Sequence, residues 1–347
     1  MALDSVKPMR PDSRVLAAFL IIATILVLAM VLSVASGVTD ITYTTVWKVV
    51  LSKIIPDVVT VDWTRAHERI IWDLRLPRSI LAALTGAGLA LSGAALQATT
   101  RNPLADPFLL GVSSGAALGA VAVISHLGAF AGVYSLPIAA FSGGALSLSL
   151  LIGVLGREGA ARSDRVILAG VAISFLLMAG TNLLIFLGDQ RASHSVVFWM
   201  LGGLGRARWD HLWIPAGTVM IGAIWLIWKA RALNALMMGE ESAYSLGIHT
   251  ARLRLTVLVL TALMTSVLVA LTGIIGFVGL VVPHIIRFWV GGDNRRLLPL
   301  CAIGGSLFMV VVDIVARTVI APQEAPIGII TGGVGGAYFC WLIAKSA

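Results

Sequence analysis

The chain has 347 residues, of which 58% are hydrophobic and only 12% charged, about half the charged share of an ordinary soluble domain. This composition indicates an integral membrane protein, so the usual estimate of two soluble domains from length does not apply. The formal net charge of +8 is better explained by loop arginines that orient a membrane protein than by a nucleic-acid partner. Cys301 and Cys340 both lie in apolar runs, which argues against a disulfide framework or a thiolate metal site.

Ten stretches are apolar enough, over roughly 20 residues, to cross a bilayer. In chain order they are 15–37, 79–99, 108–127, 135–155, 165–187, 211–228, 253–271, 273–290, 297–319 and 327–343. The first lacks the short apolar core and cleavage site of a signal peptide, so we expect a permanent helix. The seventh and eighth are the least sharply separated, because 253–290 runs almost without a polar break. The sequence therefore predicts an all-α integral membrane protein with one domain over 1–347.

The basic residues of the loops predict the direction of the chain. With ten spans both termini lie on one side, and fifteen of the 25 Lys and Arg residues then fall on the side of the termini. This excess favours cytoplasmic N- and C-termini. The longest outer segment, 38–78, contains an amphipathic piece at 46–50 that we expect to lie along the membrane surface.

Glycines recur at four-residue spacing in two spans. Gly111, Gly115 and Gly119 share one helix face, and Gly332 and Gly336 repeat this spacing in the last span. Small residues at this spacing let helix backbones approach closely in a membrane. We interpret both sets as helix-packing faces.

Sites for covalent or ion-coupled chemistry are not apparent in the sequence. No GxxxxGK[ST] phosphate loop occurs, so the chain should not hydrolyse ATP by itself. The six histidines are scattered and give no metal site. Few charges lie within spans, which argues against a secondary carrier that uses buried carboxylates. Asp313 is the exception, and it precedes Arg317 by four residues, so we expect a pair on one helix face.

Three polar stretches between spans carry more information. RLPR at 75–78 places two arginines at a predicted outer helix start, the unfavourable end of the helix dipole, so we expect something to compensate their charge. RNPLADP at 101–107 predicts a tight turn. GEESAYSLGI at 239–248 predicts a short helix that ends at Gly247. That helix could be a docking surface for a soluble partner or a plain connector.

These stretches, together with GFVGLVVPHIIR at 276–287 and DIVAR at 313–317, resemble the FecCD family of importer permeases, which carry cobalamin, iron–siderophore complexes or haem. The resemblance extends over about 15–345. It implies the ten-helix, cobalamin-permease-like fold of type II ABC importers, with no resident cofactor. It also implies three kinds of protein partner: a second copy of the chain, two cytoplasmic ABC ATPase subunits, and a periplasmic or lipid-anchored substrate-binding protein.

The resemblance also implies roles for particular residues. Arg75, Arg78 and Arg317 would pair with acidic residues on the binding protein. The fifth span and a short outer helix near 193–204 would line the translocation path, where Asn182, Gln190 and His194 are the polar candidates. The cytoplasmic segment 230–252 would couple to the ATPase, and its candidate residues are Gly239, Glu240, Glu241, Ser242, Ala243, Leu246 and Gly247.

We therefore expect the permease subunit of an ATP-driven importer in a bacterial or archaeal plasma membrane, itself not an enzyme. The expected cargo is an iron complex, either a siderophore or haem, with cobalamin as the alternative. An ion-coupled secondary transporter is the competing class, and an intramembrane enzyme would need a catalytic cluster that the sequence does not display.

Overall fold

The computed structural model describes residues 13–346, apart from 38, 40, 56–58 and 160–162. The described residues form helices and turns with no strand. The α-helices are α1 (Ser13–Ala35), α2 (Tyr43–Ile54), α3 (Arg65–Arg69), α4 (Leu76–Thr100), α5 (Val112–Ala122), α6 (Ser135–Gly159), α7 (Ser163–Leu187), α8 (Gln190–Met200), α9 (Trp209–Trp228), α10 (Ala230–Met237), α11 (Glu240–Ser245), α12 (Thr250–Thr272), α13 (Val278–Val290), α14 (Asn294–Thr318) and α15 (Ile327–Ser346). Two π-helical segments (Ile70–Arg75 and Val123–Leu127) and two 3-10 turns (Pro107–Leu110 and Gly132–Tyr134) complete the helical structure.

The predicted set of ten apolar helices is confirmed. Eight helices of the described chain are long and apolar enough to cross a membrane, and Val112–Leu127 and Val278–Val290 are two shorter apolar helices, which together make ten. Local backbone conformation explains why these two helices are short. Gly111 adopts a φ of 78° before α5, and Gly273, with a φ of 70°, ends α12. Four further residues separate Gly273 from the start of α13, and these positive φ values interrupt the apolar run in the backbone itself.

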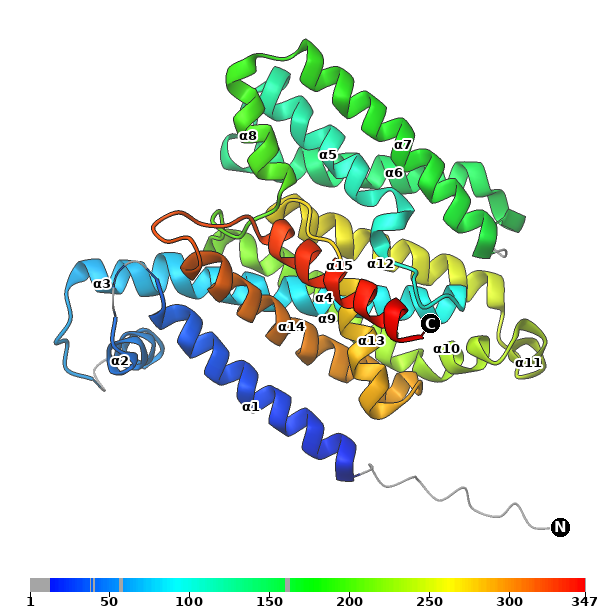
Figure 1. Cartoon of the computed structure of the whole chain (residues 1–347), viewed down its shortest axis with the longest axis horizontal. Helices are drawn as coiled ribbons and strands as arrows, with labels where there is room; N and C mark the ends of the chain where they lie inside the picture. The colour runs from blue at the N-terminus through cyan, green and yellow to red at the C-terminus, as the bar shows by residue number, and fades with distance from the viewer. Residues whose placement is uncertain (1–12, 38, 40, 56–58, 160–162, 347) are drawn as a thin grey trace.

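The helix α4 runs through the middle of the bundle (Figure 1), and 83% of its most apolar window is buried inside the chain. Its glycines allow this central position. A Cβ atom at Gly86 would lie 1.9 Å from the Gly305 carbonyl oxygen of α14, and one at Gly93 would lie 2.0 Å from the Gly279 oxygen of α13. The helix backbones are therefore in direct contact, as small residues permit in membrane helices.

Of the first predicted glycine face, Gly115 and Gly119 form a packing face, whereas Gly111 precedes α5 in a left-handed conformation and is not on that helix. The second face has no partner among the described residues. A Cβ atom at Gly115 would lie 2.2 Å from the Gly143 oxygen of α6, and one at Gly119 would lie 2.0 Å from the Ala139 oxygen. By contrast, no atom lies within 4 Å of a Cβ built at Gly332 or Gly336 on α15. The glycine face of α15 is thus open in a single chain.

The second span begins earlier than the sequence predicts, which corrects the placement of RLPR. A continuous helical stretch runs over Arg65–Thr100, and Arg75 and Arg78 lie inside it, at the junction of the π-helical segment and α4. Pro77 has no N–H, and a local π-helical turn is a usual way for a helix to accommodate such a loss. The two arginines are therefore not at a helix start, so the helix-dipole argument does not apply to them.

The ends of the bundle carry different elements. The first residues of α1 and the last residues of α15 lie at the same end of the bundle as α10 and α11 (Figure 1). Helices α3 and α8 lie at the opposite end of the bundle. We call these the α11 end and the α8 end. Near the α8 end the amphipathic helix α2 packs Val46 and Val49 against Ile71 and exposes Trp47, as its sequence pattern predicts.

Candidate functional site

The first candidate, Arg75, is buried and caps another helix. Its guanidinium donates to the carbonyl oxygens of Val34 (3.0 Å), Ala35 (2.7 Å) and Thr39 (2.9 Å). Two of these oxygens belong to the last turn of α1, where carbonyl groups lack helical partners and a cation is favourable. Gly37 leaves room for the contact, because a Cβ there would lie 2.4 Å from the Arg75 Nη2 atom.

Arg78 and Arg317 meet in a buried cluster with Asp313 and Glu324, which we call the arginine–carboxylate cluster. Asp313 Oδ1 lies 2.8 Å from Arg78 Nε, and Asp313 Oδ2 lies 3.1 Å from Arg317 Nε. Arg78 Nη1 also donates to both carboxylate oxygens of Glu324, at 2.8 and 2.9 Å. Arg317 reaches α1 as well, because its Nη2 donates to the Ser33 hydroxyl at 2.7 Å. The cluster joins α1, α4, α14 and the loop before α15 at the α8 end.

The predicted compensation of the arginine charges is therefore found within the chain. Arg75, Arg78 and Arg317 are each less than a tenth exposed, and their partners are carbonyl oxygens, the Ser33 hydroxyl and two carboxylates. The predicted Asp313–Arg317 pair is confirmed. The part of the cluster at the surface is the Glu324 side chain, which is 52% exposed. A partner approaching this surface meets Glu324 before Arg78.

At the α11 end, the predicted short helix is present as α11. Gly247 adopts a φ of 76° and its N–H donates to the Tyr244 oxygen at 2.9 Å, while Ile248 N–H donates to the Ala243 oxygen at 3.0 Å. This left-handed glycine ends the helix as expected. Ala243 is buried beneath α11, whereas Tyr244, at 74%, and Leu246 are exposed. The helix therefore presents an apolar and aromatic surface that nothing in the described chain covers.

Contacts that the sequence does not reveal hold α11 and the neighbouring α10 in place. Glu240 forms an ion pair of 2.8 Å with Arg254 of α12, and Arg254 is buried. Nearby, the Asn234 amide donates to Asp293 at 2.6 Å and its oxygen accepts from Asn294 at 2.8 Å. These contacts join α10 to the start of α14. Hydrogen bonds from Arg295 and Asn234 lower the pKa of Asp293 to about 2, against the opposing effect of burial.

The RNPLADP turn also forms as predicted. The Asn102 carboxamide accepts a hydrogen bond from Leu104 N–H at 2.9 Å, and Asp106 accepts one from Phe108 N–H at 2.8 Å. Asp106 lies outside the spans but is buried, and burial raises its pKa to about 6 despite the Phe108 hydrogen bond. Its second oxygen lies against α13, because a Cβ at Gly279 would approach it to 3.0 Å.

The path candidates Asn182, Gln190 and His194 are all exposed on α7 and α8. His194 stacks on Phe198 of the same helix, with ring centroids 4.6 Å apart. No hydrogen bond, ion pair or ring contact joins any two of these three side chains in the part of the chain that the structure describes, so a single chain does not bring them into one enclosed site. They lie on the group of helices farthest from α1 (Figure 1).

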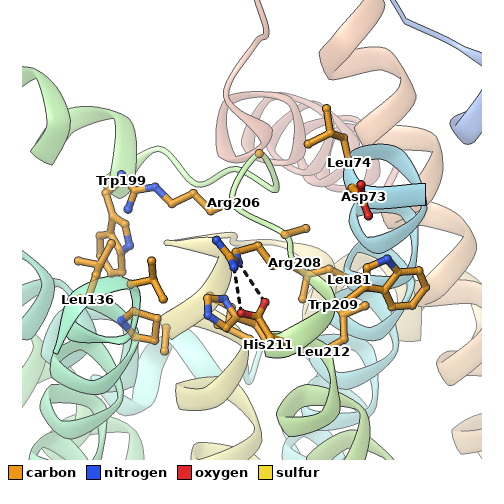
Figure 2. A pocket seen from close by; sticks show the side chains of 18 residues that line it. Asp73, Leu74, Leu81, Leu136, Trp199, Arg206, Arg208, Trp209, His211 and Leu212 are labelled. Carbon is orange, nitrogen blue, oxygen red and sulfur yellow. Dashed lines mark hydrogen bonds and ion pairs between the residues drawn. The ribbon is translucent and has the colours of Figure 1, made fainter. Parts of the chain in front are cut away.

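Sequence reasoning missed a cavity of about 830 Å³ at the α8 end. We call it the outer pocket, after the side on which the sequence predicts this end of the spans to lie. Figure 2 shows its polar side chains, contributed by the segment before α4, by the loop between α8 and α9 and by the start of α9. Arg208 and Asp210 pair with each other at 3.0 and 3.1 Å. The residues come from four separate parts of the chain, so no local spacing indicates the pocket. Its main lining residues are Asp73, Leu81, Trp199, Arg206, Leu212 and Leu271.

Comparison with known proteins gives consistent results. The FecCD transport family matches residues 25–345. The hemin transport system permease protein HmuU of Yersinia pestis is 40% identical over 290 residues, which are 82% of this chain and 86% of that protein. The vitamin B12 import system permease protein BtuC of Salmonella typhimurium is 40% identical over 288 residues, 82% of this chain and 87% of that protein.

A solved structure is similar along nearly the whole chain. It is an inward-facing conformation of a metal-chelate type ABC transporter, with a TM-score of 0.81 and 31% identity, and the match covers 95% of this chain and 99% of that one. This likeness confirms the type II ABC importer fold. The chain belongs to the FecCD transport family and is the membrane-spanning permease of an ABC importer.

Proposed function

We propose that the permease acts as a homodimer, with two ATPase subunits at its α11 end and a periplasmic or lipid-anchored binding protein at its α8 end. The α11 end would then be cytoplasmic and the membrane would be a bacterial or archaeal plasma membrane. The observation that carries the proposal is α11 itself, a short helix with exposed Tyr244 and Leu246 that is anchored to α12 through the Glu240–Arg254 ion pair. An exposed element fixed to a span can transmit motion from a soluble partner to the bundle.

The coupling segment 230–252 makes the ATPase contact in this proposal. Gly239, Glu240, Glu241, Ser242, Ala243, Leu246 and Gly247 are the residues assigned to it. Leu246→Asp places a charge on the exposed apolar surface without touching the core, and Gly247→Val strains the left-handed position that ends the helix. Both variants should lose ATPase binding or ATP-coupled uptake. Gly292→Asp, which places the same charge at an exposed position of the loop between α13 and α14, where a Cβ has open space, is the control. Normal ATPase binding and normal ATP-coupled uptake in both α11 variants would contradict the assignment of this segment to ATPase coupling.

The binding protein is proposed to dock through Arg75, Arg78 and Arg317 by presenting carboxylates to the arginine–carboxylate cluster. In the free chain Glu324 occupies the Arg78 edge of this cluster, so a docking carboxylate would compete with it. Glu324→Gln should then strengthen binding-protein affinity by about fivefold, since an exposed pair is worth up to about 1 kcal/mol. Surface plasmon resonance with the binding protein measures the change. An unchanged or weaker affinity argues against Arg78 as a docking residue.

The second copy is proposed to pack on α7, α8 and α15 and to enclose the path that Asn182, Gln190 and His194 would line. The open Gly332 and Gly336 positions of α15 support this arrangement, because a backbone without side chains accepts a close neighbour. Gly336→Leu should convert the dimer to a monomer in light scattering. Gly153→Leu, at an open position of α6, should leave the dimer intact.

The proposed cargo is an iron complex, either a ferric siderophore or haem. The 40% identity to the hemin permease supports it. Cobalamin is the second candidate, favoured by the 40% identity to the vitamin B12 permease. Titrating the cognate binding protein with haem, a ferric siderophore and cobalamin separates the three. Tight binding of cobalamin alone would exclude the iron proposal.

A further inference from the structure

The outer pocket has polar groups at its rim and an apolar floor. Its volume of about 830 Å³ is within the range of small-molecule sites, roughly 300–1,000 Å³. Leu81, Leu212 and Leu271 are apolar lining residues, which we call the floor, and each lies within about two turns of the end of α4, α9 or α12. Arg206 and Arg208 belong to the loop that precedes α9. The pocket thus extends from the hydrocarbon level of the spans to the water at their ends.

Three of its polar groups have no partner among the residues that the structure describes. His211 is only 8% exposed, and its buried Nε2 atom makes no hydrogen bond. Among the described residues, the Arg206 guanidinium and the Asp73 carboxylate form no hydrogen bond or ion pair. Arg208 and Asp210 neutralise each other. A buried imidazole nitrogen without a partner is costly, so the pocket is complementary to a ligand that satisfies it.

The two free charges have opposite signs and lie on opposite sides of the opening (Figure 2). Arg206 lies on the side of Trp199 and Asp73 lies on the side of α4, with His211 between the two sides. A ligand that is complementary to this arrangement carries an anionic group near Arg206 and His211 and a cationic group near Asp73. It also has an apolar part that covers the leucines of the floor.

Aromatic side chains place the pocket at the membrane–water boundary. The Trp72 and Trp209 rings lie 5.0 Å apart beside it, and the Tyr134 ring lies 4.9 Å from His211. Trp213, one turn further along α9, is 71% exposed. Tryptophan and tyrosine are enriched at the level of lipid headgroups, and exposed Leu74 and Val133 at the rim offer a side entrance from lipid.

We propose that the outer pocket binds one zwitterionic, amine-bearing phospholipid of the outer leaflet. The phosphate accepts hydrogen bonds from Arg206 and from an Nε2–H of His211, the ammonium group pairs with Asp73, and the upper acyl chain covers Leu81, Leu212 and Leu271. A free phosphate would satisfy only the basic side and leave the apolar floor in contact with water. The choice of the outer leaflet rests on the proposed orientation, with the α8 end outside, but the lipid site involves neither the proposed ATPase nor the binding protein or cargo.

The test measures which lipid the purified full chain retains. Native mass spectrometry is carried out in detergent with phosphatidylethanolamine, phosphatidylcholine and phosphatidylglycerol of identical acyl chains. The wild type should retain one phosphatidylethanolamine per chain, at least about tenfold above phosphatidylcholine, whose quaternary ammonium cannot donate to Asp73. Arg206→Gln should lower retention of all three lipids about tenfold. Asp73→Asn should abolish the preference for the amine. Arg69→Gln, an exposed arginine outside the pocket, should behave as the wild type.

Fold integrity is checked by the thermal unfolding midpoint without added lipid, which should not change for the exposed Asp73 and Arg206 variants. Equal retention of the three lipids by the wild type, or undiminished retention by Arg206→Gln, would overturn the proposal. Displacement of the lipid by inorganic phosphate would also overturn it, since it would identify a simple anion site. Displacement by haem or cobalamin at equal stoichiometry would assign the pocket to cargo instead.

Discussion

Replacing Asp313 by asparagine should destabilise the permease more than any other single charge removal at the α8 end. Asp313 is fully buried and lies between Arg78 and Arg317. The asparagine keeps the size of the side chain but removes the charge. Arg317 is then left with neutral acceptors such as the Ser33 hydroxyl and carbonyl, and Arg78 retains only the exposed Glu324.

The size of the effect follows from burial. Removing one partner of a buried ion pair typically costs 3–5 kcal/mol, because the remaining charge stays buried without compensation. We expect a loss of about 3–5 kcal/mol in the free energy of unfolding for Asp313→Asn. Glu324→Gln changes the other carboxylate on Arg78, but Glu324 is half exposed, so its loss should stay below about 1 kcal/mol. The pair of variants isolates burial as the cause.

The assay is unfolding of the detergent-purified chain by sodium dodecyl sulfate, followed by far-ultraviolet circular dichroism. The double variant Asp313→Asn, Arg317→Met should recover part of the loss, since it removes one of the two buried cations. If Asp313→Asn and Glu324→Gln differ by less than about 1 kcal/mol, the burial argument is refuted.

Three further predictions concern packing, protonation and the coupling segment. Gly115→Ala should cost about 1–3 kcal/mol in the same assay, because its Cβ would lie 2.2 Å from a carbonyl of α6, whereas Gly153→Ala, with open space, should cost nothing. The pKa of Asp106 in the folded chain is about 6 instead of the usual 3.8, so the folded state favours the protonated carboxyl group. The contribution of this group to the free energy of unfolding is fully present below pH 3.8 and is lost as the pH rises through 6. Asp106→Asn, which mimics the protonated form, should therefore gain up to about 3 kcal/mol at pH 7.5 and nothing at pH 3.5; an equal change at both pH values would contradict the assignment. Glu240→Gln should speed amide exchange in α11 without lowering the global unfolding midpoint, and unchanged exchange would show that the Arg254 ion pair does not anchor the helix.

The sequence predicts the spans well because each needs about 20 apolar residues in one run. It predicts contacts only where they are local. The Asp313–Arg317 pair follows from a four-residue spacing, but Arg78 and Asp313 are 235 residues apart, and no local pattern links them. For that reason the sequence indicates that the arginines need compensation without indicating what provides it.

The early start of the second span is also not predicted from the sequence, but for a different reason. Residues 65–75 contain many charges, so an apolar-run criterion excludes them. In the fold, Glu68 pairs with Lys53 of α2 at 2.5 Å, and Ile71 is buried against α2. These tertiary contacts stabilise a helical turn that hydropathy alone does not predict. The outer pocket was missed for a related reason, since its lining combines segments that are adjacent only after folding.

The most direct test of the account is uptake into proteoliposomes that contain the permease, its cognate ATPase and its binding protein loaded with labelled cargo. We predict uptake that requires all three proteins and hydrolysable ATP, with none when the permease alone is given a proton or sodium gradient. Gradient-driven uptake by the permease alone, at a rate equal to that of the complete system with ATP, would contradict the assignment.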